Sequence, residues 1–231
     1  MILSSTLLPI FTILLSLPNT LAHPTTDDLS LQLHPRSNPG DSKSNPIRAE
    51  IEIRGEDALT YDVDCWAMLC KGKSAVMQKV DTDAADVNRQ YGMKASPATN
   101  AWGDHKGWVS AEEFPFASTK EGGKDAILVG VTINSQDEQK RSLRSFYQKN
   151  KVKSYDAKNN MSDGSWFEIT GFKVKSGKSA KVGPYCQAFT DKKTGNVCSA
   201  STKVIGDWGF DVAEYAYVYN HSTKKFDYVG K

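Results

Sequence analysis

Three carboxylates stand close together in residues 112–123, which run Glu-Glu-Phe-Pro-Phe-Ala-Ser-Thr-Lys-Glu-Gly-Gly. Glu112, Glu113 and Glu121 flank an aromatic pair built around a proline, and two glycines end the segment. Carboxylates can hold a divalent cation or move a proton, and a Gly-Gly pair lets the backbone approach a ligand closely. The segment is therefore either an acidic site or a turn that carries solvated acids.

Regular elements are expected on both sides of these acids. The β-branched run Ala126–Ile133 predicts a buried strand, and Phe114–Ala117 predicts a short strand before it. Apolar residues recurring at i, i+3 and i+4 predict a helix from about Asp137 to Asn150. Strand, glycine turn, strand and helix make a compact ββα unit, in which the three acids flank the first strand.

The remaining pattern predicts one α+β domain with a mixed or antiparallel sheet, few helices and a β-rich C-terminal part. A second helix is expected at Asp81–Gly92, where acids fill the first turn and a glycine can end the helix. Met93–Gly107 is expected to be a loop, and its His105 is interpreted as a loop histidine rather than a general base. Further strands are expected at Ile51–Ile53, Leu59–Val63, Trp166–Val174, Tyr185–Thr190 and Tyr215–Tyr219.

The N-terminal residues predict export from the cell. Leu7–Leu17 is a short apolar run with a small-residue ending at Ala22, which is typical of a signal peptide over residues 1–22. Residues 23–47 are polar and rich in Pro and Ser, which predicts a disordered propeptide or linker. Residues 48–231, about 185 residues, suffice for one domain with a core. No later run is long enough to span a membrane, so an extracellular location is expected.

The cysteines and sequons agree with an extracellular protein. An even number of cysteines in a secreted chain predicts two disulfides, for which three connectivities exist. A local Cys186–Cys198 pair across a β-hairpin is the preferred pairing, which leaves Cys65 with Cys70. A zinc site is the weaker alternative, because the sequence has neither a CxxC motif nor paired histidines. Sequons at Asn160 and Asn220 predict glycosylation.

Positive charge is concentrated in two runs, although the whole chain carries only +2. Lys140–Lys153 holds six basic residues and no acid, and Lys173–Lys193 holds six lysines and one aspartate. Such patches attract polyanions. An ordinary solvated face is the alternative interpretation of both runs.

The segment Ser110–Gly123 resembles the core motif of the secreted deoxyribonucleases of the NucA/NucB family. In fungal members this motif reads Ser-Cys-Asp-Glu-Tyr-Pro-Phe-Ala-Ser-Thr, followed by Glu-Gly-Gly. The resemblance extends to Asp62–Lys73, Leu143–Tyr147 and Asp163–Phe167. The chain departs from the family pattern in having Ala111 in place of a cysteine, Glu112 in place of an aspartate, and an altered Asn- and Gly-rich stretch before the helix.

The resemblance implies metal-dependent, non-specific hydrolysis of DNA outside the cell, with Mg²⁺ or Mn²⁺ as the cofactor and no obligate protein partner. By position it implies catalytic roles for Glu112, Glu113 and Glu121, and metal ligands at Glu113, Gln136 and Glu138. It also implies that phosphates are held by Lys140, Arg141, Arg144 and Lys149. The alternative is a catalytically weakened or inactive secreted protein on the same scaffold, which binds nucleic acid or a host or cell-wall partner.

Overall fold

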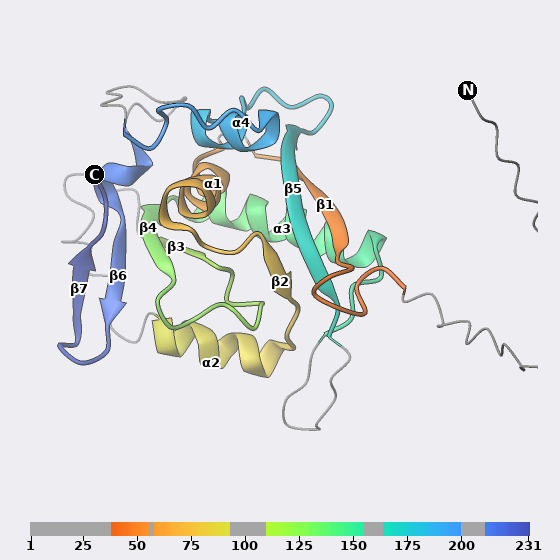
Figure 1. Cartoon of the computed structure of the whole chain (residues 1–231), viewed down its shortest axis with the longest axis horizontal. Coiled ribbons are helices and arrows are strands. Elements are labelled where there is room, and N and C mark those ends of the chain that lie inside the picture. The colour runs from red at the N-terminus through yellow and green to blue at the C-terminus, as the bar shows by residue number, and fades with distance from the viewer. Residues whose placement is uncertain (1–37, 56–57, 93–109, 155–163, 200–210) are drawn as a thin grey trace, which may run out of the picture. The chain divides into compact units, whose positions relative to one another are not determined.

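The computed structural model describes residues 38–55, 58–92, 110–154, 164–199 and 211–231. In this part of the chain, α1 lies between the β3–β4 pair and the β1–β5 pair (Figure 1). The elements follow in the order β1 (Ile47–Ile53), α1 (Leu59–Lys71), β2 (Val76–Gln78), α2 (Thr82–Gly92), β3 (Ser110–Phe114), β4 (Ile127–Val131), α3 (Ile133–Lys149), β5 (Trp166–Val174), α4 (Pro184–Asp191), η3 (Val212–Tyr215), β6 (Tyr217–Asn220) and β7 (Lys225–Tyr228).

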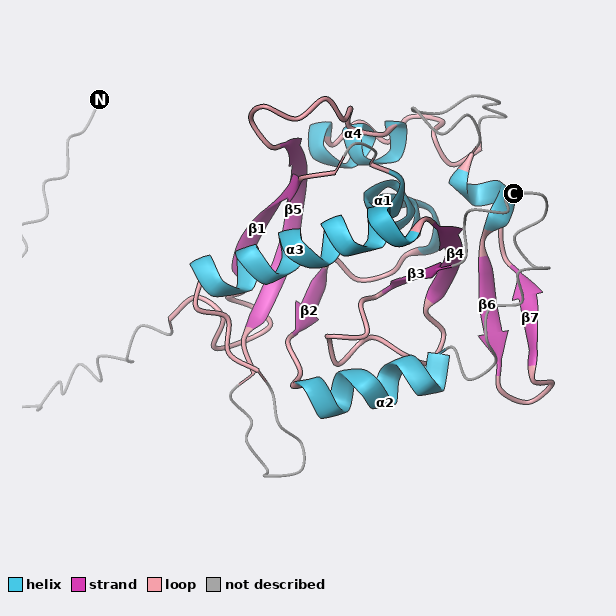
Figure 2. Cartoon of the chain, turned by 180° about the vertical axis from the view of Figure 1, so that it is seen from behind, coloured by secondary structure: helices cyan, strands magenta, loops and turns pink. Residues whose placement is uncertain are grey.

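The strands form two sheets, with the orders β1-β5-β2 and β3-β4-β6-β7. In the first sheet β1 runs parallel to β5 and β2 runs antiparallel to it, whereas the second sheet is antiparallel throughout. Helix α3 crosses behind β1 and β5 in Figure 1 and in front of them in Figure 2. The predicted α+β class with mixed and antiparallel sheets is confirmed.

The predicted strand at Leu59–Val63 is wrong, because these residues begin helix α1. Every residue from Leu59 to Met68 is buried, so α1 is a core helix covered on all sides. A helix of this kind has no single apolar stripe, and its β-branched and aromatic residues resemble those of a strand. It ends at Gly72, which adopts the left-handed conformation and donates its N–H to the carbonyl of Ala67.

The predicted strand at Tyr185–Thr190 is also wrong, because the chain forms helix α4 there. Asp62, on α1, caps this helix: its Oδ1 accepts the N–H of Cys186 at 3.0 Å. The helix is preceded by Gly183, and a Cβ added there would come within 2.4 Å of the Asp62 carboxyl carbon. Only glycine lets the start of α4 approach Asp62 this closely.

Both disulfides are present, but the predicted pairing is wrong. Cys65 bonds Cys186, and Cys70 bonds Cys198. The predicted hairpin is a helix and the loop that follows it, so Cys186 faces α1 rather than its own neighbour in sequence. Both bonds therefore tie α1 to the segment that contains α4, over separations of 121 and 128 residues.

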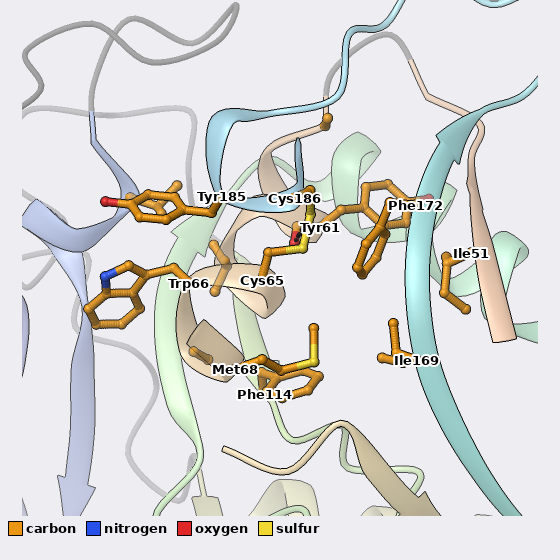
Figure 3. Packing of buried hydrophobic residues seen from close by; sticks show 14 of the residues in the cluster. Ile51, Tyr61, Cys65, Trp66, Met68, Phe114, Ile169, Phe172, Tyr185 and Cys186 are labelled. Carbon is orange, nitrogen blue, oxygen red and sulfur yellow. Dashed lines mark hydrogen bonds between the residues drawn. A yellow bond between two sulfur atoms is a disulfide. The ribbon is translucent and has the colours of Figure 1, made fainter. Parts of the chain in front are cut away.

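The core surrounds α1 on both sides, as Figure 3 shows. Tyr61 meets the ring of Phe172 edge-on at 6.0 Å between centroids. Trp66 and Met68, further along the helix, are buried in the same cluster as Phe114 of β3. This packing fixes the position of α1 relative to both sheets.

Several other predicted elements are found, some with shifted boundaries. The predicted strands at Ile51–Ile53, Ala126–Ile133 and Trp166–Val174 correspond to β1, β4 and β5, and the predicted helix at Asp81–Gly92 corresponds to α2. The strand predicted at Phe114–Ala117 instead covers Ser110–Phe114, and the helix predicted from Asp137 begins at Ile133. Where a strand was expected at Tyr215–Tyr219, the short helix η3 precedes β6.

Some predictions fall on residues outside the described ranges. These are the signal peptide, the part of the expected linker up to residue 37, and the loop 93–107 with His105. Residues 38–46 are described and form a turn against β5, in which the carbonyl of Gly40 accepts the N–H of Trp166. No helix in the described ranges is long and apolar enough to cross a membrane.

Candidate active site

Two carboxyl groups meet in the core beside α3. Gln139 donates through its Nε2 to Glu112 Oε1 and to Asp64 Oδ2, each at 2.9 Å. Glu112 lies on β3 and Asp64 on α1, so the three side chains come from three elements far apart in sequence. All three side chains are buried.

The first turns of α3 hold Glu112 in place. Gln136 donates to the carbonyl of Ala111 at 2.8 Å and lies 3.4 Å from Glu112 Oε2. Ser110 in turn donates to Gln136 Oε1. Because α3 begins at Ile133, Gln136 and Gln139 are three residues apart on one face of the helix, so both amides point toward β3. The Thr132 hydroxyl caps the helix by accepting the Ser135 N–H at 3.1 Å.

Burial raises the pKa of both carboxyl groups. Loss of solvent raises the pKa of Glu112 to about 8, although the hydrogen bond from Gln139 works in the opposite direction. Loss of solvent, together with the nearby charge of Glu112, raises the pKa of Asp64 well above its ordinary value. Asp64 Oδ1 is buried and has no hydrogen-bond partner among the described residues. The pair therefore holds a proton at neutral pH.

Glu113, the neighbour of Glu112 on β3, belongs to the other face of the strand, because successive strand residues point to opposite faces. Burial raises the pKa of Glu113 to about 7, and the charge of Arg89 on α2 opposes this shift. Its Oε2 is buried and has no hydrogen-bond partner in the described ranges. Glu112 and Glu113 thus do not converge on one point.

The third predicted acid, Glu121, supports the fold. Its Oε2 accepts the N–H of Gln78 at 2.9 Å, which ties the turn after β3 to the edge strand β2. Glu138 forms an ion pair of 2.7 Å with Arg141. The predicted ligands Glu113, Gln136 and Glu138 are therefore not brought together. Within the described ranges no three His, Cys, Asp or Glu side chains form a group that could hold a metal ion.

The predicted phosphate-binding residues lie on the exposed side of α3, and Asn220, one of the two predicted glycosylation sites, lies at the end of β6. The exposed cations are Lys140, Arg141, Arg144 and Lys149. Asn220 ends β6 and donates to Asp227 Oδ2 at 2.7 Å, while its Oδ1 accepts the backbone N–H of Ser222. Asn160 falls in 155–163, outside the described ranges.

Asp64 and Gln139 are the site residues that sequence reasoning missed. Asp64 stands directly before Cys65 within the segment that resembles the NucA/NucB family, but a strand prediction over the preceding residues hid its place on a helix. Gln139 lies one helical turn after Gln136, so the helical spacing on α3 could have found it.

We expect the folded state to lose stability as the pH rises from about 4.5 to about 8 in metal-free buffer. The pKa of Glu112 moves on folding from an ordinary 4.5 to about 8, and burial likewise raises the pKa of Asp62 to about 8. Between these values the folded protein keeps protons that the unfolded chain has released, so a rise in pH favours unfolding. Melting temperatures measured across this range test the prediction.

The matched variants for this experiment are Glu112→Gln and Asp191→Asn. Gln does not titrate, so the melting temperature of Glu112→Gln should fall less steeply with pH than that of the wild type. Asp191 is exposed at the end of α4, and its replacement should leave the slope unchanged. Equal slopes for Glu112→Gln and wild type would contradict the assignment of a raised pKa to Glu112.

The fold and the site define an α+β protein with a buried acid pair held by glutamine amides. A comparison with protein-family models matches residues 64–159 to the family described as deoxyribonuclease NucA/NucB. Residues 64–159 are therefore similar to this nuclease family. The matched residues begin at Asp64 and include Glu112 and Gln139, so they contain the whole acid pair. A search of curated proteins finds none that matches this chain.

Proposed function

We propose that this protein is a secreted, metal-dependent endonuclease that hydrolyses DNA phosphodiester bonds, with Glu112 as the general base. The observation that carries the proposal is the buried pair of Glu112 and Asp64, bridged by Gln139 inside the segment that matches the nuclease family. The two disulfides suit an oxidising extracellular environment, which supports secretion.

Glu112 has the acidity that a general base needs. A base works best when its pKa lies near the operating pH, and burial brings the pKa of Glu112 to about 8. Glu112 would take a proton from the attacking water, and Asp64 would share that proton. Gln139 and Gln136 would hold the Glu112 carboxylate in a fixed orientation, because each amide is itself held by its helix and its hydrogen bonds.

A divalent cation fits the chemistry of this site. Mg²⁺ and Mn²⁺ prefer oxygen ligands, which the carboxylates of Asp64 and Glu112 would supply, whereas the amide oxygen of Gln136 accepts from Ser110. The unpartnered Asp64 Oδ1 is an available ligand atom. When bound, the cation would stabilise the negative charge that develops on the phosphate. Binding would require both carboxyl groups to ionise, so it would release protons.

We expect purified protein to nick plasmid DNA when Mg²⁺ or Mn²⁺ is present and to lose this activity in EDTA. Removal of the cation leaves two buried carboxylates whose raised pKa keeps a proton on the pair, and the phosphate loses its counter-charge. Agarose gels of supercoiled, nicked and linear plasmid measure the activity. Restoration by excess Mn²⁺ after EDTA is the control. Cleavage that persists in EDTA would contradict metal dependence.

The burial of the acid pair favours a second function, which is DNA binding without catalysis. Glu112 is only 1% exposed, and the amides of Gln136 and Gln139 cover it. If water and DNA cannot reach the pair, the protein is a non-catalytic binder that uses its exposed cations. A salt-sensitive gel shift of DNA without cleavage in any metal would favour this function.

A further inference from the structure

Two adjacent cavities lie at the C-terminal end of α3, away from the acid pair. The first, of about 430 Å³, lies between β1 and α3 and is lined by Arg54, Ser145 and Lys149, among others. The second, also about 430 Å³, is lined by Lys151, Lys153 and the turn that precedes β1. Asn150 lines both cavities, so they adjoin each other, and we call the pair the α3 groove.

The charges that remain unpaired in the α3 groove are mostly positive. Two of its acids are matched by cations, because Glu52 pairs with Arg54 at 3.1 Å and Glu50 pairs with Lys173. The third acid, Asp41, accepts the backbone N–H of Asn38 at 2.8 Å. By contrast, the described ranges contain no ion pair for a row of three alternating lysines on the groove wall, namely Lys149, Lys151 and Lys153. Three unmatched ammonium groups in a hollow are suited to a polyanion.

The backbone holds these lysines in a fixed arrangement. Lys149 ends α3, and Lys151 takes the left-handed conformation with a φ of 52°. The N–H of Val152 bonds the carbonyl of Tyr147 at 2.9 Å, which closes the end of the helix. Lys153 donates its N–H to Ser165 Oγ at 3.0 Å and accepts the Ser165 N–H at 3.1 Å. Because the backbone is already fixed, binding has to order only the lysine side chains.

We propose that the α3 groove binds the phosphates of a DNA strand at a distance from the bond that is cut. The proposal rests on the proposed function, because it assumes that the acid pair is the cutting site. Gln139, at that site, and Lys149, at the groove, are ten residues apart on α3. At 1.5 Å per residue this is about 15 Å along the helix. That length corresponds to roughly four to five base pairs at about 3.4 Å each.

The substrate class that follows is a polynucleotide long enough to span both places. Short oligonucleotides that end within about four base pairs of the cut should bind more weakly, because they cannot reach the lysine row. The lysines carry no fork of donors that could read base edges, so the contact should be independent of sequence.

The test compares two triple variants by fluorescence anisotropy with a labelled DNA duplex, in metal-free buffer. The first carries Lys149→Gln, Lys151→Gln and Lys153→Gln. The second, with the same change in charge, carries Lys178→Gln, Lys192→Gln and Lys193→Gln, three exposed lysines of the other basic run. Each phosphate contact contributes about 0.9 to the slope of log Kd against log salt. The first variant should therefore lose about two to three units of slope, and the second should keep the wild-type slope. Melting curves confirm that both are folded.

The outcomes separate the groove from the proposed function, because binding is measured without catalysis. Loss of slope in the first variant alone supports the groove, even if the wild type cuts no DNA. Equal losses in both variants, or none in the first, overturn the groove, even if the wild type cuts DNA. A cleavage assay on the first variant adds a second readout: KM for long DNA should rise while kcat stays unchanged.

Discussion

Replacing Glu112 by Gln should lower the rate of DNA cleavage by about 10²- to 10⁴-fold, which is the contribution of one well-placed general base. Gln has the shape of Glu and still presents an oxygen to Gln139, so the three-way contact with α3 is kept. It cannot accept the proton of the attacking water. Because ionising the buried carboxyl group of Glu112 is unfavourable, the variant should be at least as stable as the wild type at neutral pH. Initial rates of plasmid nicking at saturating Mn²⁺ measure the effect.

The comparison with Glu121→Gln makes this experiment discriminating. The Glu121 side chain accepts a backbone N–H from β2, and a Gln amide oxygen can do the same, so its rate should match the wild type. Asp191→Asn, at an exposed carboxylate on α4, controls for a general change in charge. A large loss of rate in Glu121→Gln with full activity in Glu112→Gln would place the chemistry on the turn after β3 and refute the acid pair.

Removing both disulfides should bring the protein to the limit of folding at ordinary temperature, whereas removing one should leave it folded but less stable. The two bonds interleave along the chain: Cys65 and Cys70 are five residues apart, and Cys186 and Cys198 are twelve apart. While one bond is intact, the other closes a ring of only these short pieces, which is worth about 3 kcal/mol by chain entropy. The last remaining bond closes a loop of more than a hundred residues, worth about 5 kcal/mol.

Urea unfolding of three variants tests this order. Cys65→Ala with Cys186→Ala and Cys70→Ala with Cys198→Ala should each lower the free energy of unfolding by about 3 kcal/mol, and the fourfold variant by about 8 kcal/mol. A domain's net stability is itself about 5–15 kcal/mol, so the fourfold variant is at the limit of folding. Reduction of the wild type by dithiothreitol should reproduce the fourfold result. Additive losses of about 5 kcal/mol for each pair would show that the two bonds act independently and would contradict this prediction.

Elements whose own residues carry a strong local signal could be predicted. The β-branched run of β4, the alternation of β5 and the acidic first turn of α2 are such signals. Helices α1 and α4 could not be predicted in the same way. Burial on every side removes the helical stripe from α1, and α4 is a short helix whose start is held by Asp62 and by a disulfide to α1. Its support comes from residues more than a hundred positions away.

The sequence could predict only those site residues that lie close together along the chain. Glu112 stands out by its motif, and its partner Gln136 lies near enough in sequence to be considered with it. Whether Glu113 shares the site depends on strand register, because a one-residue step moves a side chain to the other face. Asp64 joins Glu112 only through the packing of α1 against β3, and no local pattern records that contact.

The parallel pairing of β1 with β5 has a consequence for how the protein is made. β1 ends at Ile53, but the strand that completes it ends at Val174, and both disulfide partners of α1 come later still. During synthesis β1 therefore cannot pair until β5 has emerged, whereas α1 can pack against β3, β4 and α3 before its disulfide partners are made. The segment that matches the nuclease family, 64–159, contains neither strand of this pair. The β1–β5 sheet is therefore completed late, from strands that are synthesised far apart in time.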